Sequence, residues 1–149
     1  MRALVLALTL AACAEPAQQA ETPAAIATEA SPEDVEAALA QMPSWPDARA
    51  AGVDFRAVGQ EPGWIADIYQ RDRIRVLLDY GQSVTDFPLP IPTYPAEGAI
   101  RYETQRDGRT LVINVRRFPC ADAMSGEPYP ATVELVVDGR TLSGCGKSV

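Results

Sequence analysis

The chain has 149 residues, a net charge of −7, a single lysine and no histidine. This length supports one small domain. Without clusters of Lys and Arg a chain cannot neutralise a run of phosphates, so we expect no nucleic-acid partner. The absence of histidine removes the commonest general base and metal ligand and excludes Ser-His-Asp and Cys-His catalysis. We therefore expect no enzyme activity, no catalytic residues, no metal and no cofactor. The acidic surface serves either solubility or attraction to a basic partner.

The first thirteen residues resemble the signal of a bacterial lipoprotein. A basic Arg2 precedes an uncharged apolar run over residues 3–12, and Cys13 follows. The run has the length of a signal-peptide core and is too short for a permanent membrane-spanning helix. Residues 10–13 read LAAC, which is similar to the lipobox motif at which lipoprotein signals are cut. The alternative is an ordinary signal peptide with a cysteine at its cleavage site.

The lipobox resemblance implies that the mature chain begins at Cys13 and carries acyl chains on its thiol and its new amino group. Two or more acyl chains anchor a protein stably in a bilayer, whereas a single chain holds it only marginally. Ala14, and not an aspartate, follows the cysteine. By analogy with Gram-negative sorting this favours the outer membrane. We expect a protein anchored to the bacterial envelope through acylated Cys13 and facing the periplasm.

A short helix is expected between the anchor and the folded domain. Ser31 is a suitable N-cap, Pro32 suits the first helical position, and acidic residues occupy the first turn. The helix would run from Pro32 to about Met42 and end at Pro43. Its apolar face either docks on the domain or leaves the helix nascent within the tether. The expected division is a signal peptide at 1–12, a lipidated disordered tether at 13–30, a short helix and linker at 31–50, and a β domain at 51–149.

Eight segments of the β domain are predicted as strands. They are rich in branched and aromatic residues, and several alternate apolar with polar positions. Asp107-Gly108 and Asp138-Gly139 are strong hairpin turns. The proline-rich segment 88–95 is expected as an extended crossing or edge loop. The pattern predicts a mainly β fold, a small antiparallel barrel or sandwich of seven to eight strands with one short N-terminal helix. The expected strands are 54–59, 64–70, 74–80, 83–87, 99–105, 110–118, 131–137 and 140–144.

The cysteines divide into one lipid carrier and one pair. With Cys13 assigned to the anchor, Cys120 and Cys145 remain. In an exported, oxidising setting this pair predicts one structural disulfide. The alternative is a redox-active pair, but such pairs usually lie close together as C-x-x-C near a helix start. We expect the bridge to hold the loop after the sixth strand against the last strand.

Three motifs resemble a family of uncharacterised bacterial lipoproteins. The family carries a G-N-E-P-x-W-like start, a C-x-D-x-M-S segment followed by Y-P, and a terminal G-C-G. Here these motifs read GQEPGW at 59–64, CADAMSG at 120–126 with YP at 129–130, and GCG at 144–146, so Gln60 stands where the family usually has Asn. The resemblance covers about residues 55–146 and implies a periplasm-facing β domain without implying an activity. More loosely, the domain looks like small envelope β barrels that act as lysozyme inhibitors or stress-linked lipoproteins.

The motifs supply four candidate binding residues, each with a structural alternative. Glu61 and Trp64 would form an aromatic surface beside a carboxylate, unless Trp64 lies in the core and Glu61 satisfies backbone N–H groups in its turn. Asp122 and Ser125 would present a polar loop to a partner, unless they bond the loop's own backbone. Met124 is expected to fill a gap in the core.

The function expected from the sequence is binding. We expect a membrane-anchored lipoprotein that displays a small non-catalytic binding or inhibitory β domain in the periplasm. Its partners would be the lipid bilayer, through acylated Cys13, and an envelope protein. The alternative is a structural envelope-maintenance or stress-linked lipoprotein without a discrete ligand.

Overall fold

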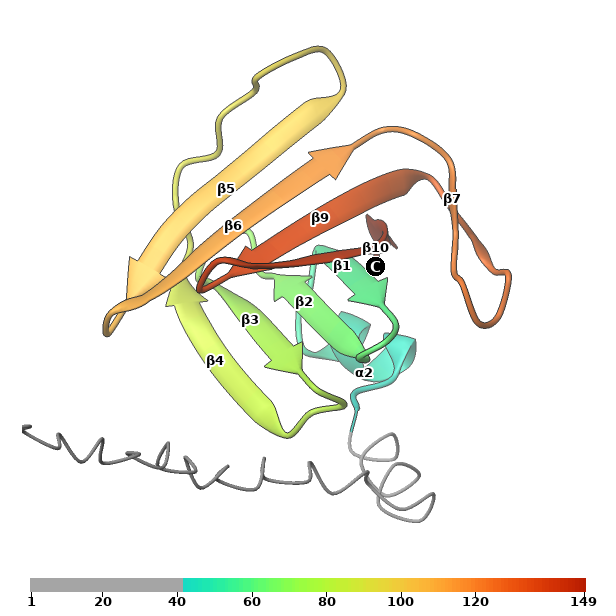
Figure 1. Cartoon of the computed structure of the whole chain (residues 1–149), viewed down its shortest axis with the longest axis horizontal. Helices are drawn as coiled ribbons and strands as arrows, with labels where there is room; N and C mark the ends of the chain where they lie inside the picture. The colour runs from blue at the N-terminus through green and yellow to red at the C-terminus, as the bar shows by residue number, and fades with distance from the viewer. Residues whose placement is uncertain (1–41) are drawn as a thin grey trace, which may run out of the picture.

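Eight strands of residues 42–149, the part of the chain that the computed structural model describes, form one antiparallel sheet that curls into a nearly closed barrel (Figure 1). The predicted small antiparallel barrel is thereby confirmed. The strand order around the barrel is β4-β3-β2-β1-β10-β9-β6-β5. The strands are β1 (Phe55–Gly59), β2 (Trp64–Ile68), β3 (Arg73–Leu78), β4 (Ser83–Pro88), β5 (Ala99–Arg106), β6 (Arg109–Arg116), β9 (Ala131–Val137) and β10 (Arg140–Ser148).

The two ends of the barrel differ in how the strands are joined. Four tight hairpins, β1–β2, β3–β4, β5–β6 and β9–β10, lie at one end, which we call the hairpin end. Asp107 and Asp138 adopt positive φ angles of 50° and 51° in two of these turns, each before a glycine, which confirms both predicted hairpins. The chain termini of the barrel, the β2–β3 hairpin and the longer β4–β5 and β6–β9 connections lie at the other end, which we call the open end.

The seam between β4 and β5 is closed by side chains. Three side chains reach across it: Thr104 Oγ1 donates to the carbonyl of Pro88 (3.0 Å), Arg106 to the carbonyl of Asp86 (2.8 Å), and Arg109 to Thr85 Oγ1 (2.6 Å). The proline-rich loop before β5 covers part of the free edge of β5, where Thr93 pairs with Arg101. Because unpaired strand edges attract other strands, these contacts protect the seam.

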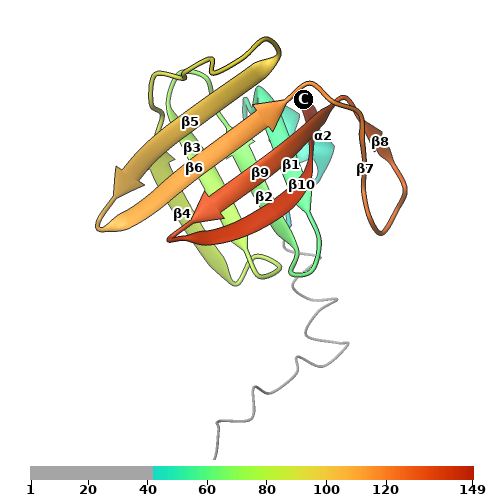
Figure 2. The same ribbon diagram turned by 45° about the horizontal axis from the view of Figure 1, so that its top comes forward.

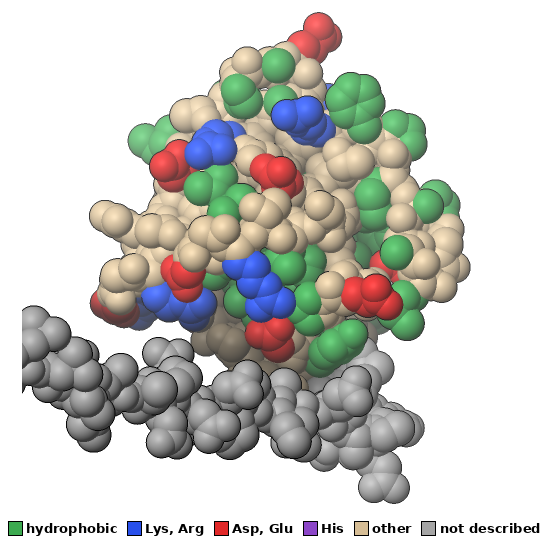
Figure 3. All heavy atoms as spheres, in the orientation of Figure 1, with side chains coloured by type: hydrophobic (Ala, Val, Ile, Leu, Met, Phe, Trp, Pro, Cys, Tyr) green, Lys and Arg blue, Asp and Glu red, His purple; other side chains and the backbone are tan. Residues whose placement is uncertain are grey.

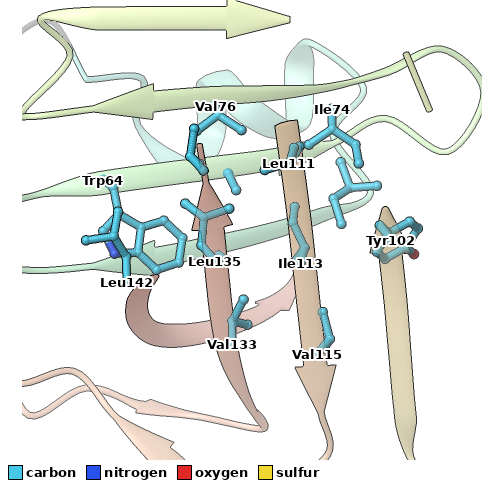
Figure 4. Close-up of a cluster of buried hydrophobic side chains, with 14 of the residues drawn as sticks. Trp64, Ile74, Val76, Tyr102, Leu111, Ile113, Val115, Val133, Leu135 and Leu142 are labelled. Atoms are coloured by element: carbon cyan, nitrogen blue, oxygen red, sulfur yellow. The ribbon is translucent and has the colours of Figure 1, made fainter. Parts of the chain in front are cut away.

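The barrel interior is filled by alternate side chains of every strand, and Trp64 is the largest of them (Figure 4). Trp64 is 1% exposed and packs near Leu142 at the hairpin end. Its indole lies against Gly59 and Gly144, the inward-facing residues of the neighbouring strands. A Cβ on Gly144 would overlap the backbone oxygen of Val58 and lie 2.7 Å from the indole, so both glycines make room for the ring. β10 continues through its glycines beyond the predicted end at residue 144, because it pairs with β1 as far as Ser148.

A short helix, α2 (Trp45–Ala50), precedes the barrel within the segment expected as a linker. Ser44 caps it, and Asp47 completes a capping box by accepting from the Ser44 backbone N–H (3.2 Å). Ala48 of α2 packs with Val53 and Tyr69 in a small second core. The helix predicted at 32–42 lies almost entirely outside the described residues, as do the signal peptide and the tether. No helix within 42–149 is long and apolar enough to cross a membrane.

A buried ion pair attaches the segment before α2 to the outside of the barrel. Arg56 on β1 and Asp67 on β2 face outward and form two hydrogen bonds of 2.6 and 2.7 Å. Arg56 also donates to the carbonyls of Pro43 (2.5 Å) and Ser44 (3.1 Å). The guanidinium thus has acceptors on both sides, which a buried charge requires. It fixes Trp45 over the outer face of the barrel.

Replacing Gly144 with alanine tests the packing around Trp64. The new Cβ meets backbone on one side and the indole on the other, so we expect a loss of about 1–3 kcal/mol in the free energy of unfolding, as for other overpacked cores. Denaturant unfolding measures it. The neighbouring Ser143→Ala, on the exposed outer face, is the control and should change stability by less than about 0.5 kcal/mol. Equal stability of the two variants would contradict this packing.

Candidate functional site

The connection between β6 and β9 forms a two-stranded ribbon that the sequence did not predict. Its strands are β7 (Cys120–Ala121) and β8 (Pro128–Tyr129), and Figure 2 shows them projecting beside the barrel near α2. The disulfide between Cys120 and Cys145 attaches β7 to the outer face of β10, with the two Cα atoms 5.6 Å apart. The predicted bridge is confirmed, and it holds the base of the ribbon to the barrel.

The loop between β7 and β8, residues 122–127, is held in one conformation by its own hydrogen bonds. The Asp122 carboxylate accepts from the Ser125 backbone N–H (2.8 Å) and hydroxyl (2.7 Å). The Asp122 N–H donates to the carbonyl of Glu127, and the Gly126 N–H donates to that of Asp122, both at 2.9 Å. The bonds from Ser125 hold the pKa of Asp122 below its ordinary value, so the carboxylate is ionised at neutral pH.

The loop also contacts the turn between β1 and β2, so the first two motifs meet in space. Gln60 Nε2 donates to Asp122 Oδ1 at 3.4 Å. Glu61, beside Gln60, is exposed and has a φ of 55°. The structure therefore brings Gln60, Asp122 and Ser125 together. Glu61 is exposed beside them and forms no side-chain hydrogen bond to any of the three.

Aromatic and charged side chains support the base of the ribbon. Trp45 and Tyr129 pack with ring centroids 6.1 Å apart. The only lysine of the chain, Lys147 on β10, places its Nζ 4.5 Å from the Trp45 centroid and 4.8 Å from that of Tyr129. It also pairs with Glu127 at 2.6 Å. These cation–π and ionic contacts hold β8 and the end of the loop against α2 and β10.

Two hollows flank the loop and leave it standing as a ridge. The first, about 530 Å³, lies over the outward-facing residues of β6, β9 and β10, including Asn114, Arg116 and Glu134. The second, about 390 Å³, has an apolar lining that includes Trp45 and Tyr129. Met124 stands at the tip of the ridge.

Met124 corrects a prediction made from the sequence. It was expected to fill a gap in the core, but its side chain is 71% exposed. In this six-residue loop the Asp122 carboxylate is buried against Ser125, whereas Met124 points outward. No sequence pattern distinguishes this methionine from a buried one, because the two-residue strands beside its loop have no periodicity to assign a face.

Trp64 is placed differently from the other candidates. It is in the barrel core, and only part of it contributes to the wall of the second hollow. Its indole Nε1 has no acceptor among residues 42–149. The lipidation candidate Cys13 lies outside the described residues. Among residues 42–149 there is no group of three or more His, Cys, Asp or Glu side chains that could hold a metal ion.

The surface of the described residues carries charges of both signs. Residues 42–149 contain 12 basic and 14 acidic side chains, whereas residues 1–41 contain 1 basic and 6 acidic ones. Figure 3 shows the two signs interspersed on the face that it presents. Many are paired, as Arg75 is with Asp86 at 2.7 Å and Arg109 with Asp138 at 2.9 Å. The acidic character of the chain therefore belongs mainly to its N-terminal part, and the barrel offers no field of one sign.

Comparison with known proteins yields no match to a family model, to a curated protein or to a solved structure. The family resemblance of the three motifs stays a prediction.

Removing the disulfide tests how strongly the ribbon depends on it. We expect Cys120→Ser with Cys145→Ser to lower the free energy of unfolding by about 3 kcal/mol, because a bridge that closes a loop of this length restricts the unfolded chain. Thermal unfolding of the oxidised and reduced wild-type protein measures the same effect without substitution. Equal melting temperatures with and without reductant would contradict it.

Proposed function

We propose that this protein is a non-catalytic binding module, displayed in the periplasm on a lipid anchor at Cys13, and that it binds a partner protein through the β7–β8 loop. The observation that carries the proposal is the exposure of Met124 at the tip of a loop whose conformation is already fixed. The disulfide, the Asp122 carboxylate and the contact from Gln60 fix it.

A fixed loop favours binding because little conformational entropy is lost when a partner is engaged. Methionine is enriched at the cores of protein interfaces, where its flexible, polarisable side chain fits varied surfaces. A ridge with a hollow on each side can also receive the partner's side chains beside Met124. Projecting loops of small binding domains insert into concave surfaces, so the same geometry suits an inhibitor that enters a cleft.

The chemistry around the ridge favours a protein over a charged polymer. The second hollow is mainly apolar, and it places Trp45 and Tyr129 near Met124. The first hollow contains Arg116, which forms no ion pair within residues 42–149, and Glu134. An apolar centre with polar groups beside it is the usual composition of a protein interface.

The lipid anchor rests on the sequence of residues 1–13. The apolar run and the LAAC motif support export and acylation of Cys13. The acidic segment that follows would carry the barrel away from the membrane surface, where anionic lipids repel acidic side chains.

Capture from solubilised envelope extract tests the binding site. The whole chain with Cys13→Ser, which removes the acylation site, is immobilised beside the same chain carrying Met124→Glu. We expect to capture a partner whose affinity falls about tenfold or more when a charge replaces the apolar tip. A side chain at the centre of an interface contributes about 1–2 kcal/mol or more to the binding free energy.

The matched control is Val84→Glu, which places the same charge on an exposed apolar residue of β4. The control should keep the partner. If Met124→Glu and Val84→Glu retain it equally, the site is not the β7–β8 loop.

A further inference from the structure

The open end of the barrel contains a cavity that the binding loop does not use. It measures about 300 Å³. Its wall is formed by side chains of the barrel core itself, so the cavity opens into the barrel interior. These core residues are Phe55, Ile68, Ile100, Tyr102, Val115 and Ala131.

The cavity lies between aromatic side chains that line it without filling it. Trp64 occupies the hairpin end, whereas Phe55 and Tyr102 form part of the cavity wall toward the open end. A dry apolar cavity of about 150 Å³ already binds benzene, and small-molecule sites begin near 300 Å³. The space is therefore large enough for a short hydrocarbon chain and too small for a large polycyclic ligand.

The charged residues that line the cavity lie at its mouth. Asp54 there is engaged, because its carboxylate accepts from the Gln70 N–H at 2.8 Å. Lys147 is also engaged, since its Nζ pairs with Glu127. Arg117 is different: it is exposed, lines the mouth, and forms no ion pair or side-chain hydrogen bond within residues 42–149. An unengaged guanidinium above an apolar cavity is suited to a carboxylate on a hydrocarbon body.

Tyr102 adds a second polar group on the cavity wall. Burial, with smaller contributions from Tyr94 and Asp54, raises the pKa of its hydroxyl. The phenol is therefore neutral and can donate a hydrogen bond.

We propose that the open end of the barrel binds a small aliphatic carboxylic acid, with its hydrocarbon chain among the core side chains and its carboxylate at Arg117. This site is separate from the β7–β8 loop and does not depend on the protein-binding function proposed above.

Calorimetric titration with decanoate, and with decanol as the uncharged counterpart, tests the proposal. The whole chain with Cys13→Ser is compared with versions that also carry Arg117→Gln or Arg116→Gln. Arg116 is the matched control, because it is the adjacent exposed arginine, is also outside any ion pair of the described residues, and does not line this cavity. All versions share the apolar run at residues 3–12, so any binding of decanoate to that run is the same in each.

We expect Arg117→Gln to weaken decanoate binding about tenfold and to leave decanol binding unchanged, whereas Arg116→Gln changes neither. Ile100→Trp, which fills the cavity, should abolish both. In the wild-type barrel, decanoate should shift the methyl NMR signals of Ile68 and Val115 and spare those of Leu142 at the far end.

The proposal is overturned if decanoate fails to bind at concentrations on the order of 1 mM. It is also overturned if the two arginine variants weaken binding equally, or if Leu142 shifts as much as Val115. The methyl shifts in the wild-type chain keep the test decisive should Ile100→Trp not fold.

Discussion

An eight-stranded barrel encloses little more space than its own side chains occupy, and this constraint determines where the protein can meet other molecules. Trp64 takes the space at the hairpin end, and it fits only because Gly59 and Gly144 present no Cβ toward it. At the other end Phe55 and Tyr102 line a cavity of about 300 Å³ without filling it. Recognition must therefore use the open end or the outer surface.

The segment before α2 packs on the outer face of β1 and β2 and shapes the surface there. Arg56 and Asp67 are buried between the barrel and the segment before α2, and Arg56 ties the carbonyls of Pro43 and Ser44 to β1. Buried pairs of this kind contribute less to net stability than to fixing one arrangement, because desolvation offsets much of their attraction. Here the arrangement places Trp45 beside Tyr129 and Lys147. The base of the β7–β8 ribbon rests on that group, and the disulfide secures its other strand.

Local patterns in the sequence were enough to predict the barrel strands. The alternation of Val133, Leu135 and Val137 and the two Asp-Gly turns depend only on neighbouring residues, and the corresponding strands and hairpins are present. The β7–β8 ribbon was not predicted, because its two-residue strands have no periodicity to detect. The contact from Gln60 to Asp122 joins residues 62 positions apart, and the disulfide that holds the ribbon joins residues 25 positions apart. The candidate site is thus assembled from contacts that sequence spacing does not encode, although Asp122 and Ser125 were found through their motif.

A photo-reactive residue placed at position 124 of the intact protein in cells tests whether the tip of the β7–β8 loop meets a partner in the envelope, with the same residue at position 84 on the exposed surface of β4 as reference. If the proposed site is right, a discrete cross-linked species forms from position 124 and is absent from position 84. Identical patterns from the two positions, or no cross-link from position 124, would contradict it.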